Sequence, residues 1–254
     1  MKSFILFLLS IQIFGNIVAQ DGIPKGANVL LKAYPATIKG YKNGCLIMAD
    51  NSTIIYTESK EKKSHTELIN SSNVGDIFAY PYIKGVVKNI ARNHDPGRIR
   101  SEDLLKAMYG ARPIDVERNL TTIIWCPKLV NKRLRITKIN GVDRQLQKVS
   151  DELDKHPELK NYLLNSGTFY WRKVRGSNRL SSHSFGIAID LNPKYSNYWQ
   201  WDCRCSSETT ILGYKNRIPQ LIVDIFEKHG FIWGGKWYHY DTMHFEYRPE
   251  LLID

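Results

Sequence analysis

Two short β-forming segments, far apart in the chain, each place a polar side chain within a run of apolar residues. Residues 186–192 read GIAIDLN and residues 243–247 read MHFEY. Segments this short and this rich in apolar and β-forming residues are typical of buried strands. A carboxylate or imidazole in such a strand must find a hydrogen-bond partner or bind a ligand. The two segments therefore predict two strands, each with a polar side chain in a buried setting.

Segments with helical periodicity surround these two predicted strands. A helix is predicted to begin after Gly141, because apolar residues recur there at i, i+4, i+7 and i+11, which is one face of an α-helix. A second helix is predicted over 219–230, with proline at its start and glycine at its end, and a short one over 157–164. The pattern predicts an α+β domain, a small antiparallel sheet with flanking helices. The apolar face of the first helix consists of Val142, Leu146, Val149 and Leu153.

The amino-terminal part of the chain has a different pattern. Residues 27–58 alternate apolar and turn residues, as short strands and hairpins do. A helix is predicted to begin near Ser101, whose side chain can cap it, and another over 114–119. We predict a smaller, mostly β accessory region of unknown role over 20–125, followed by a main domain over 126–254.

Residues 1–19 have the pattern of a secretory signal peptide. Lys2 is followed by an apolar run from Phe4 to Phe14 that is short for a membrane span, and Ala19 is a suitable cleavage point. An uncleaved anchor is the alternative. We expect a secreted or periplasmic protein that meets the membrane only transiently, during export.

The charge of the chain is strongly positive, with a net charge of +11 at pH 7. Residues 84–135 contain twelve Lys or Arg against five Asp or Glu. Exported basic proteins often meet anionic polymers, so an anionic cell-wall polymer is a candidate partner of this stretch; a solvated basic face without a partner is the alternative. Neither a Cys/His finger nor an aromatic-basic RNA-binding consensus accompanies the charge, so we predict no nucleic-acid partner.

Four cysteines occur in the chain. In an oxidising compartment, Cys45–Cys126 and Cys203–Cys205 are two pairings that the sequence leaves open, because spacing does not determine connectivity. The single residue between Cys203 and Cys205 is not the spacing of a zinc site. We therefore expect structural or free cysteines.

Histidine and aspartate residues near the two predicted strands can supply a metal site. A catalytic zinc site needs three protein ligands and one open position, and His183, Asp190 and His244 can provide the ligands. Asp241 lies three residues before His244, so it can exchange protons with water and a leaving amine at the same place. The spacing of His183 and Asp190 alone is more typical of a hydrogen-bonded core pair.

The combination of both segments resembles a known enzyme family. SSHSFGIAID matches Ser-x-His-x-x-Gly-x-Ala-x-Asp, and DTMHFE matches Asp-x-x-His followed by apolar and acidic residues. Together with GTFYWR, NRLSSHSFGIAIDLN and EKHGFIWGGKWYHYDTMHFEYRPEL, they resemble the zinc D-alanyl-D-alanine carboxypeptidase family of cell-wall peptidases. This family also includes phage L-alanyl-D-glutamate endolysins and vancomycin-resistance dipeptidases. The resemblance covers about residues 130–250 and implies a Hedgehog-like fold around a zinc site.

The resemblance implies one zinc ion per chain, bound by His183, Asp190 and His244, with Asp241 as the general base. It also implies hydrolysis of a peptide bond in peptidoglycan stem peptides, either as a D-Ala-D-Ala carboxypeptidase or as an L-Ala-D-Glu-type endopeptidase. The alternative is a non-catalytic, zinc-stabilised cell-wall-binding module, because the same general fold serves binding in the Hedgehog signalling domain. The carboxylate of Asp241 favours the enzyme, since a binding module needs no base.

Further residues are expected to support or line the site. Ser181 occupies the serine of the motif and is expected to support the ligand loop. The family uses an arginine to bind substrate and stabilise the oxyanion, and Arg172 is the first candidate and Arg179 the second, because guanidinium stays charged and donates in a fixed fork. His239 is expected to contact Asp241 or line the cleft, with an ordinary core or surface histidine as the alternative. Trp237 is expected to shape the floor of the site.

Overall fold

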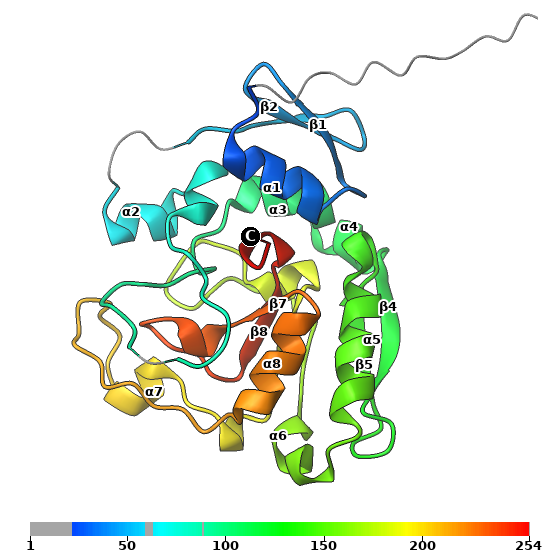
Figure 1. The fold of residues 1–254 in the computed structure, drawn as a ribbon, viewed down its shortest axis with the longest axis vertical. Coiled ribbons are helices and arrows are strands. Elements are labelled where there is room, and N and C mark those ends of the chain that lie inside the picture. Colours follow the sequence, from blue (N-terminus) through cyan, green and yellow to red (C-terminus); the bar gives the residue numbers. More distant parts are fainter. Residues whose placement is uncertain (1–21, 59–62, 88, 254) are drawn as a thin grey trace, which may run out of the picture.

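A computed structural model of the chain describes residues 22–58, 63–87 and 89–253 (Figure 1). The predicted signal peptide, residues 1–19, lies outside the described residues. No helix within the described ranges combines the length and the apolar character that a membrane-spanning helix needs. The α+β class predicted from the sequence is confirmed.

The central sheet has three short antiparallel strands in the order β6-β8-β7. Strands β6 (Ala188–Asp190) and β8 (His244–Tyr247) are the two strands predicted from the sequence, and β8 lies between its neighbours. Strand β7 (Phe231–Trp233) was not predicted. Pairing of β6 with β8 brings together two segments that are about fifty residues apart in the chain.

Of two amphipathic helices, α8 lies against this sheet and α5 lies beside α8, as Figure 1 shows. Helix α5 (Val142–Leu153) has its predicted apolar face fully buried, and it packs against α8 and against the hairpin β4 (Leu120–Trp125) and β5 (Lys132–Thr137). Helix α8 (Gln220–Lys228) contacts β7. A 3-10 turn (Pro157–Leu159) and the short helix α6 (Lys160–Leu163) occupy the predicted segment 157–164.

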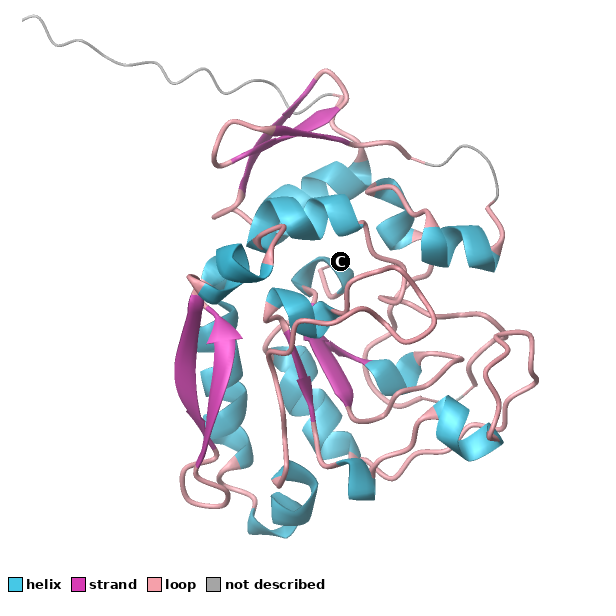
Figure 2. Ribbon diagram, turned by 180° about the vertical axis from the view of Figure 1, so that it is seen from behind, coloured by secondary structure: helices cyan, strands magenta, loops and turns pink. Residues whose placement is uncertain are grey.

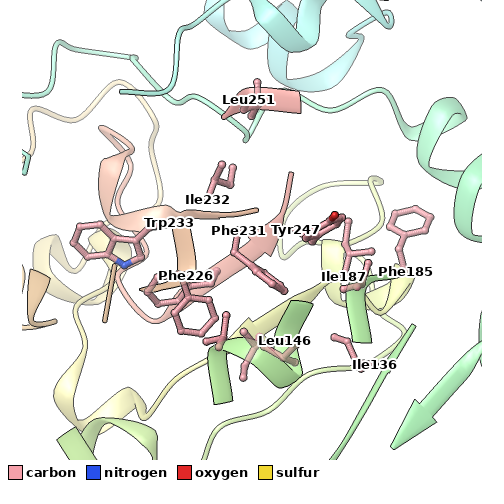
Figure 3. Close-up of a cluster of buried hydrophobic side chains, with 14 of the residues drawn as sticks. Ile136, Leu146, Phe185, Ile187, Phe226, Phe231, Ile232, Trp233, Tyr247 and Leu251 are labelled. Carbon is pink, nitrogen blue, oxygen red and sulfur yellow. The ribbon is translucent and has the colours of Figure 1, made fainter. Parts of the chain in front are cut away.

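The core between α8 and the sheet is aromatic (Figure 3). The ring of Phe226 on α8 stacks on that of Phe245 on β8, with 4.0 Å between the ring centroids, and Phe231 meets Phe226 edge to face at 5.6 Å. Trp233, the cross-strand partner of Phe245, lies 6.2 Å from it between ring centroids and donates its indole N–H to the carbonyl of Thr242 at 2.9 Å. Burying each such side chain contributes about 1.5–3 kcal/mol, so the core holds β8 firmly in place.

The amino-terminal region contains helices as well as strands, which corrects the prediction of a mostly β region. Residues 27–33, predicted as strand, belong to helix α1 (Lys25–Ala33), where Ala27 and Leu30 are buried at a helical spacing of three. Strands β1 to β3 form one antiparallel sheet, helices α2 to α4 follow it, and β4 of the next hairpin ends the region. Figure 2 shows this sheet at one end of the molecule, with helices between it and the central strands. The remaining elements are β1 (Ile38–Lys42), β2 (Cys45–Met48), β3 (Thr53–Ile55), α2 (His65–Asn70), α3 (Glu102–Tyr109), which Ser101 caps as predicted, and α4 (Pro113–Glu117).

Buried polar contacts join the segment 82–97 to the carboxy-terminal part. The hydroxyl of Tyr82 donates to Glu227 of α8 at 2.6 Å and accepts from the backbone N–H of Trp233 at 2.9 Å. The guanidinium of Arg248 donates to the carbonyl of Gly97 at 3.0 Å. Because buried hydrogen bonds of this kind are costly to break, Tyr82 and Gly97 are held against the carboxy-terminal part. The division at residue 125 stays a prediction.

The disulfide Cys203–Cys205 is formed, whereas Cys45 and Cys126 are free. Cys126 follows β4 and is fully buried against α5, where its backbone N–H donates to Ser150 Oγ at 2.7 Å. Cys45 lies on β2, in another sheet. The pairing Cys45–Cys126 that the sequence left open is therefore wrong for this fold.

Candidate functional site

A short 3-10 helix, η4 (Ser182–Phe185), presents His183. Its first turn is capped by Ser181, whose hydroxyl accepts from the backbone N–H of His183 at 3.4 Å, the contact that a supporting role requires. Gly186 ends the turn with φ of 66°, and a Cβ there would lie 2.8 Å from Leu120 Cδ2 of β4. Glycine is needed at this position both for the left-handed backbone and for the close approach, so His183 is held at a fixed angle.

Strand register places Asp190 and His244 opposite each other. The two residues are direct partners in the antiparallel pairing of β6 and β8, and their side chains lie on the same face. Asp190 Oδ1 lies 2.9 Å from His244 Nδ1. The backbone of Asp190 also exchanges two hydrogen bonds with Gly167, at 2.8 and 2.9 Å. Both residues are thus positioned by backbone pairing.

Ligand atoms of three side chains converge at the open end of this strand pair. One atom each of His183, Asp190 and His244 lie within 4.8 Å of one another. His183 Nδ1 donates to the carbonyl of Thr168 at 2.6 Å, so Nε2 is the nitrogen of this ring that can offer a lone pair to a ligand. Nε2 is buried, lies 3.1 Å from Asp190 Oδ1 and has no hydrogen-bond partner among the described residues. Two electron-rich atoms facing each other at this distance are what a cation site requires.

A buried carboxylate stands behind His244. Glu246 is fully buried, and its Oε2 lies 3.2 Å from His244 Nε2. Arg100 Nη1 at 3.2 Å and Arg248 Nη1 at 2.9 Å donate to the same carboxylate. Burial alone would raise the pKa of Glu246, but the charge of Arg100 and the hydrogen bond with His244 hold that pKa well below its usual range. An ionised carboxylate behind a histidine fixes the ring and its tautomer, as in metal sites.

The imidazole of His244 is held between two carboxylates. Burial alone would lower the pKa of His244, but hydrogen bonds with Asp190 and Glu246 raise it to about 10. At neutral pH and without a metal, the ring therefore carries a proton on the nitrogen that faces Asp190. A metal ion can replace this proton, because both supply positive charge at the same place.

Asp241 is the carboxylate without a partner in this group. It lies just before β8, where its backbone N–H donates to the carbonyl of Gly234 at 3.0 Å. Its Oδ1 is buried and has no hydrogen-bond partner within the described part of the chain. Burial and the neighbouring charge of Asp190 raise the pKa of Asp241 to about 7. A carboxylate with a pKa near neutrality can both accept and return a proton, which suits a general base.

One cleft of about 410 Å³ is lined by His183, Asp190, Asp241 and His244. Aromatic side chains form part of its wall, and five arginines line it. A larger cavity of about 780 Å³ lies between α1 and the segment 75–82, and none of the predicted site residues line it. The side chains lining the smaller cleft include Tyr198, Trp199, Trp201, Trp237, Arg98, Arg100, Arg172, Arg175 and Arg179.

The predicted substrate-binding residues all line this cleft, in different settings. Arg172 is exposed, and Arg179 is half-buried with its Nη2 donating to the carbonyl of Arg98 at 2.8 Å. Trp237 is buried, with its ring 5.6 Å from that of His244. His239 does not contact Asp241, because its Nδ1 lies 2.7 Å from Asp95 Oδ2 and its Nε2 donates to a backbone carbonyl.

Arg98 and Arg100 are cleft residues that the sequence reading did not identify. They belong to the segment 95–100, which was assigned to the accessory region, and the signal that pointed toward them was the excess of basic residues over 84–135. Local spacing could not place them, because they reach the site only through tertiary packing.

A second group of possible ligands, His65, Glu208 and His239, lies beside the cleft with its ligand atoms within 4.8 Å of one another. Arg98 donates to Glu208 at 2.6 Å and to Asp95 at 2.8 Å, and Asp95 also binds both imidazoles. The guanidinium of Arg98 supplies the positive charge that a metal ion would supply here, so the carboxylates of this group are already paired.

Comparison with known proteins gives one match. The family model described as D-alanyl-D-alanine carboxypeptidase matches residues 175–247. This segment contains the three converging side chains and Asp241, and the match supports the resemblance to peptidases of that family. No curated protein and no solved structure matches the chain.

Proposed function

We propose that the protein is a secreted zinc metallopeptidase that hydrolyses a peptide bond in peptidoglycan stem peptides. The observation that carries this proposal is the convergence of His183, Asp190 and His244 in a cleft that also holds the unpartnered carboxylate of Asp241. The match of residues 175–247 to a peptidase family supports the choice of reaction.

The three side chains fit a zinc ion in number and in type of donor atom. Two imidazole nitrogens and one carboxylate oxygen are a common ligand set of catalytic zinc. The hydrogen bond of His183 Nδ1 to Thr168 directs Nε2 toward a metal, and the carboxylate of Glu246 supports His244. A zinc ion bound there would lower the pKa of water and polarise the carbonyl of the scissile bond.

Asp241 carries out the proton transfers of the proposed reaction. Its carboxylate accepts the proton that the attacking water loses and returns it to the nitrogen of the leaving amine, so that the base is regenerated in each cycle. Arg172 lines the same cleft, and its charge acts on Asp241. A guanidinium in this position can stabilise the negative charge that develops on the carbonyl oxygen.

Site of action and partners follow from the same proposal. Export through the segment 1–19 would bring the enzyme to the periplasm or the cell exterior, where peptidoglycan lies. The basic residues of 84–135 that do not line the cleft can attract an anionic wall polymer.

The test is digestion of purified muropeptides by the protein with its zinc bound, analysed by mass spectrometry. We expect cleavage of one type of peptide bond, loss of cleavage with a chelator, and recovery with added zinc. Asp241→Asn should lower kcat/KM by about 10²–10⁴-fold while the zinc content stays at one ion per chain. Asp224→Asn, on the exposed face of α8, is the matched control and should retain full activity.

Two results would contradict the proposal. Unchanged turnover by Asp241→Asn would remove Asp241 as the base. Binding of zinc and of muropeptides without any cleavage would favour the non-catalytic wall-binding module.

A further inference from the structure

Four of the five arginines of the cleft differ in the charged groups that surround them. Arg172 lines the cleft, and its charge acts on the proposed base Asp241. Arg100 contacts Glu246, the carboxylate that lies beside His244 Nε2. The positive charge of Arg100 acts in turn on Arg179.

Arg98, Arg100 and Arg179 differ in the carboxylates that they contact. Arg98 has two carboxylate partners, Asp95 and Glu208. Arg100 has one, Glu246, which it shares with Arg248.

Arg179 has no carboxylate within 4.0 Å among the described residues, and its only side-chain hydrogen bond there is to a backbone carbonyl. Burial, together with the charges of Arg100 and Arg98, lowers the pKa of Arg179 to about 9, although the more distant carboxylates of Glu102 and Glu246 oppose this shift. A half-buried guanidinium crowded by two others is costly to the fold, because like charges repel and desolvation adds to the cost. Such an arrangement is expected where a ligand supplies the missing negative charge.

We propose that Arg100 and Arg179 form a carboxylate-binding subsite of the cleft, which holds an acidic residue of the substrate peptide at a position away from the scissile bond. This inference rests on the proposed function and specifies its substrate class as peptides with an additional carboxylate. Arg172 remains available for the carbonyl at the scissile bond. Guanidinium groups suit this task, since each can give two parallel hydrogen bonds to one carboxylate.

The subsite also gives the segment 95–100 a function in substrate choice. Arg98 supplies the backbone carbonyl that accepts from Arg179, and Pro96 supplies the one that accepts from the indole of Trp237. Both contacts link this segment to walls of the cleft contributed by the matched region 175–247. Selectivity for an acidic substrate is thus built by two parts of the chain together.

The test uses two synthetic stem pentapeptides that differ at one group, the free α-carboxylate or the α-carboxamide of the D-glutamate residue. Cleavage gives kcat/KM for each. The intrinsic fluorescence of the cleft tryptophans gives Kd for each with the Asp241→Asn protein, which binds without turnover. Losing a charge-assisted hydrogen bond to a carboxylate should weaken binding about tenfold or more. We therefore expect the wild-type protein to prefer the carboxylate peptide by about that factor in both measurements.

The variants Arg179→Gln and Arg179→Lys test whether the preference for the carboxylate peptide depends on Arg179. In Arg179→Gln, the kcat/KM and Kd values of the two peptides should differ by no more than about threefold. Arg179→Lys should retain part of the preference, because lysine keeps the positive charge but cannot donate two parallel hydrogen bonds. Arg112→Gln is the control, since Arg112 is exposed and pairs only with Asp115, outside the cleft. Arg179→Gln should melt at the same temperature as the wild type or higher, whereas loss of a structural arginine would lower it.

The outcomes separate this inference from the proposed function. Equal cleavage of both peptides by the wild type, or an unchanged preference in Arg179→Gln, would overturn the subsite while the peptidase stands. Cleavage of neither peptide would count against the peptidase, and the fluorescence measurement would still decide whether the cleft prefers the carboxylate.

Discussion

Replacement of Glu246 by glutamine tests whether a buried carboxylate tunes the proposed metal site. Its Oε2 lies 3.2 Å from His244 Nε2, while Arg100 and Arg248 donate to the same carboxylate. Loss of the carboxylate that orients a metal-binding histidine typically weakens metal binding by about 10–100-fold. The same change removes the negative charge between two buried guanidinium groups, which costs about 3 kcal/mol of folding free energy. Glu246→Gln should therefore weaken zinc binding and destabilise the protein together.

Glu250→Gln is the control that separates these two effects. Glu250 is also buried and also accepts from Arg248, and its other oxygen accepts from the hydroxyl of Tyr34. It has no hydrogen bond with His244. Glu250→Gln should lose a comparable free energy of unfolding but keep the zinc affinity of the wild type.

Two measurements on both variants decide the matter. Urea unfolding with a chelator present gives the stability of the metal-free protein, and competition with a chromophoric zinc chelator at pH 7.5 gives the zinc affinity. The expected result is a similar loss of stability in both variants, with a fall in zinc affinity confined to Glu246→Gln. Equal zinc affinities in the wild type and Glu246→Gln would refute the reasoning, since the carboxylate would then act on folding alone.

Two further predictions concern titratable groups. The pKa of His244 is raised to about 10 in the metal-free protein, so the ring is protonated at pH 7.5. Zinc binding should therefore release at least about one proton, and below that pKa the zinc affinity should rise about tenfold for each unit by which the pH is raised. Calorimetric titration with zinc in two buffers of different ionisation heat measures the release, and identical heats would contradict it. Without reductant, the native protein should show one thiol that reacts with Ellman's reagent, Cys45, and a second, Cys126, only in urea, because burial raises the pKa of Cys126 to about 12. A protein without reactive thiols in urea would show that these two cysteines are paired after all.

Local periodicity predicted the elements whose burial follows one repeating pattern. Helix α5 begins and ends close to the predicted positions, because its apolar residues repeat every three or four positions and are all buried. Strand β7 was not predicted, since a run of three apolar residues is too short to show a period. Its pairing with β8 depends on tertiary contacts that local sequence does not reveal. In α1, two buried residues at a helical spacing outweighed the turn-like composition of residues 27–33.

The site shows the same division between local and long-range information. Asp190, Asp241 and His244 could be identified because each lies on or next to a short strand, and strand pairing alone brings the first and the last together. Arg98 and Arg100 come from a segment about eighty residues before the motif, so no spacing rule could connect them with it. His239 lay close to Asp241 in sequence, but tertiary packing turned its ring toward Asp95 instead.

The alternation of β8 explains how one strand serves both the core and the site. Phe245 points to the side of α8, where it stacks on Phe226, while His244 and Glu246, one position before and after it, lie on the other face. A shift of one residue in the pairing with β6 would place Phe245 in the cleft and His244 against α8, at the cost of the aromatic stack and of a buried charge. The aromatic core therefore does more than stabilise the fold. By fixing the register of β8, it determines that the imidazole opposite Asp190 faces the cleft and that its supporting carboxylate lies on the same face.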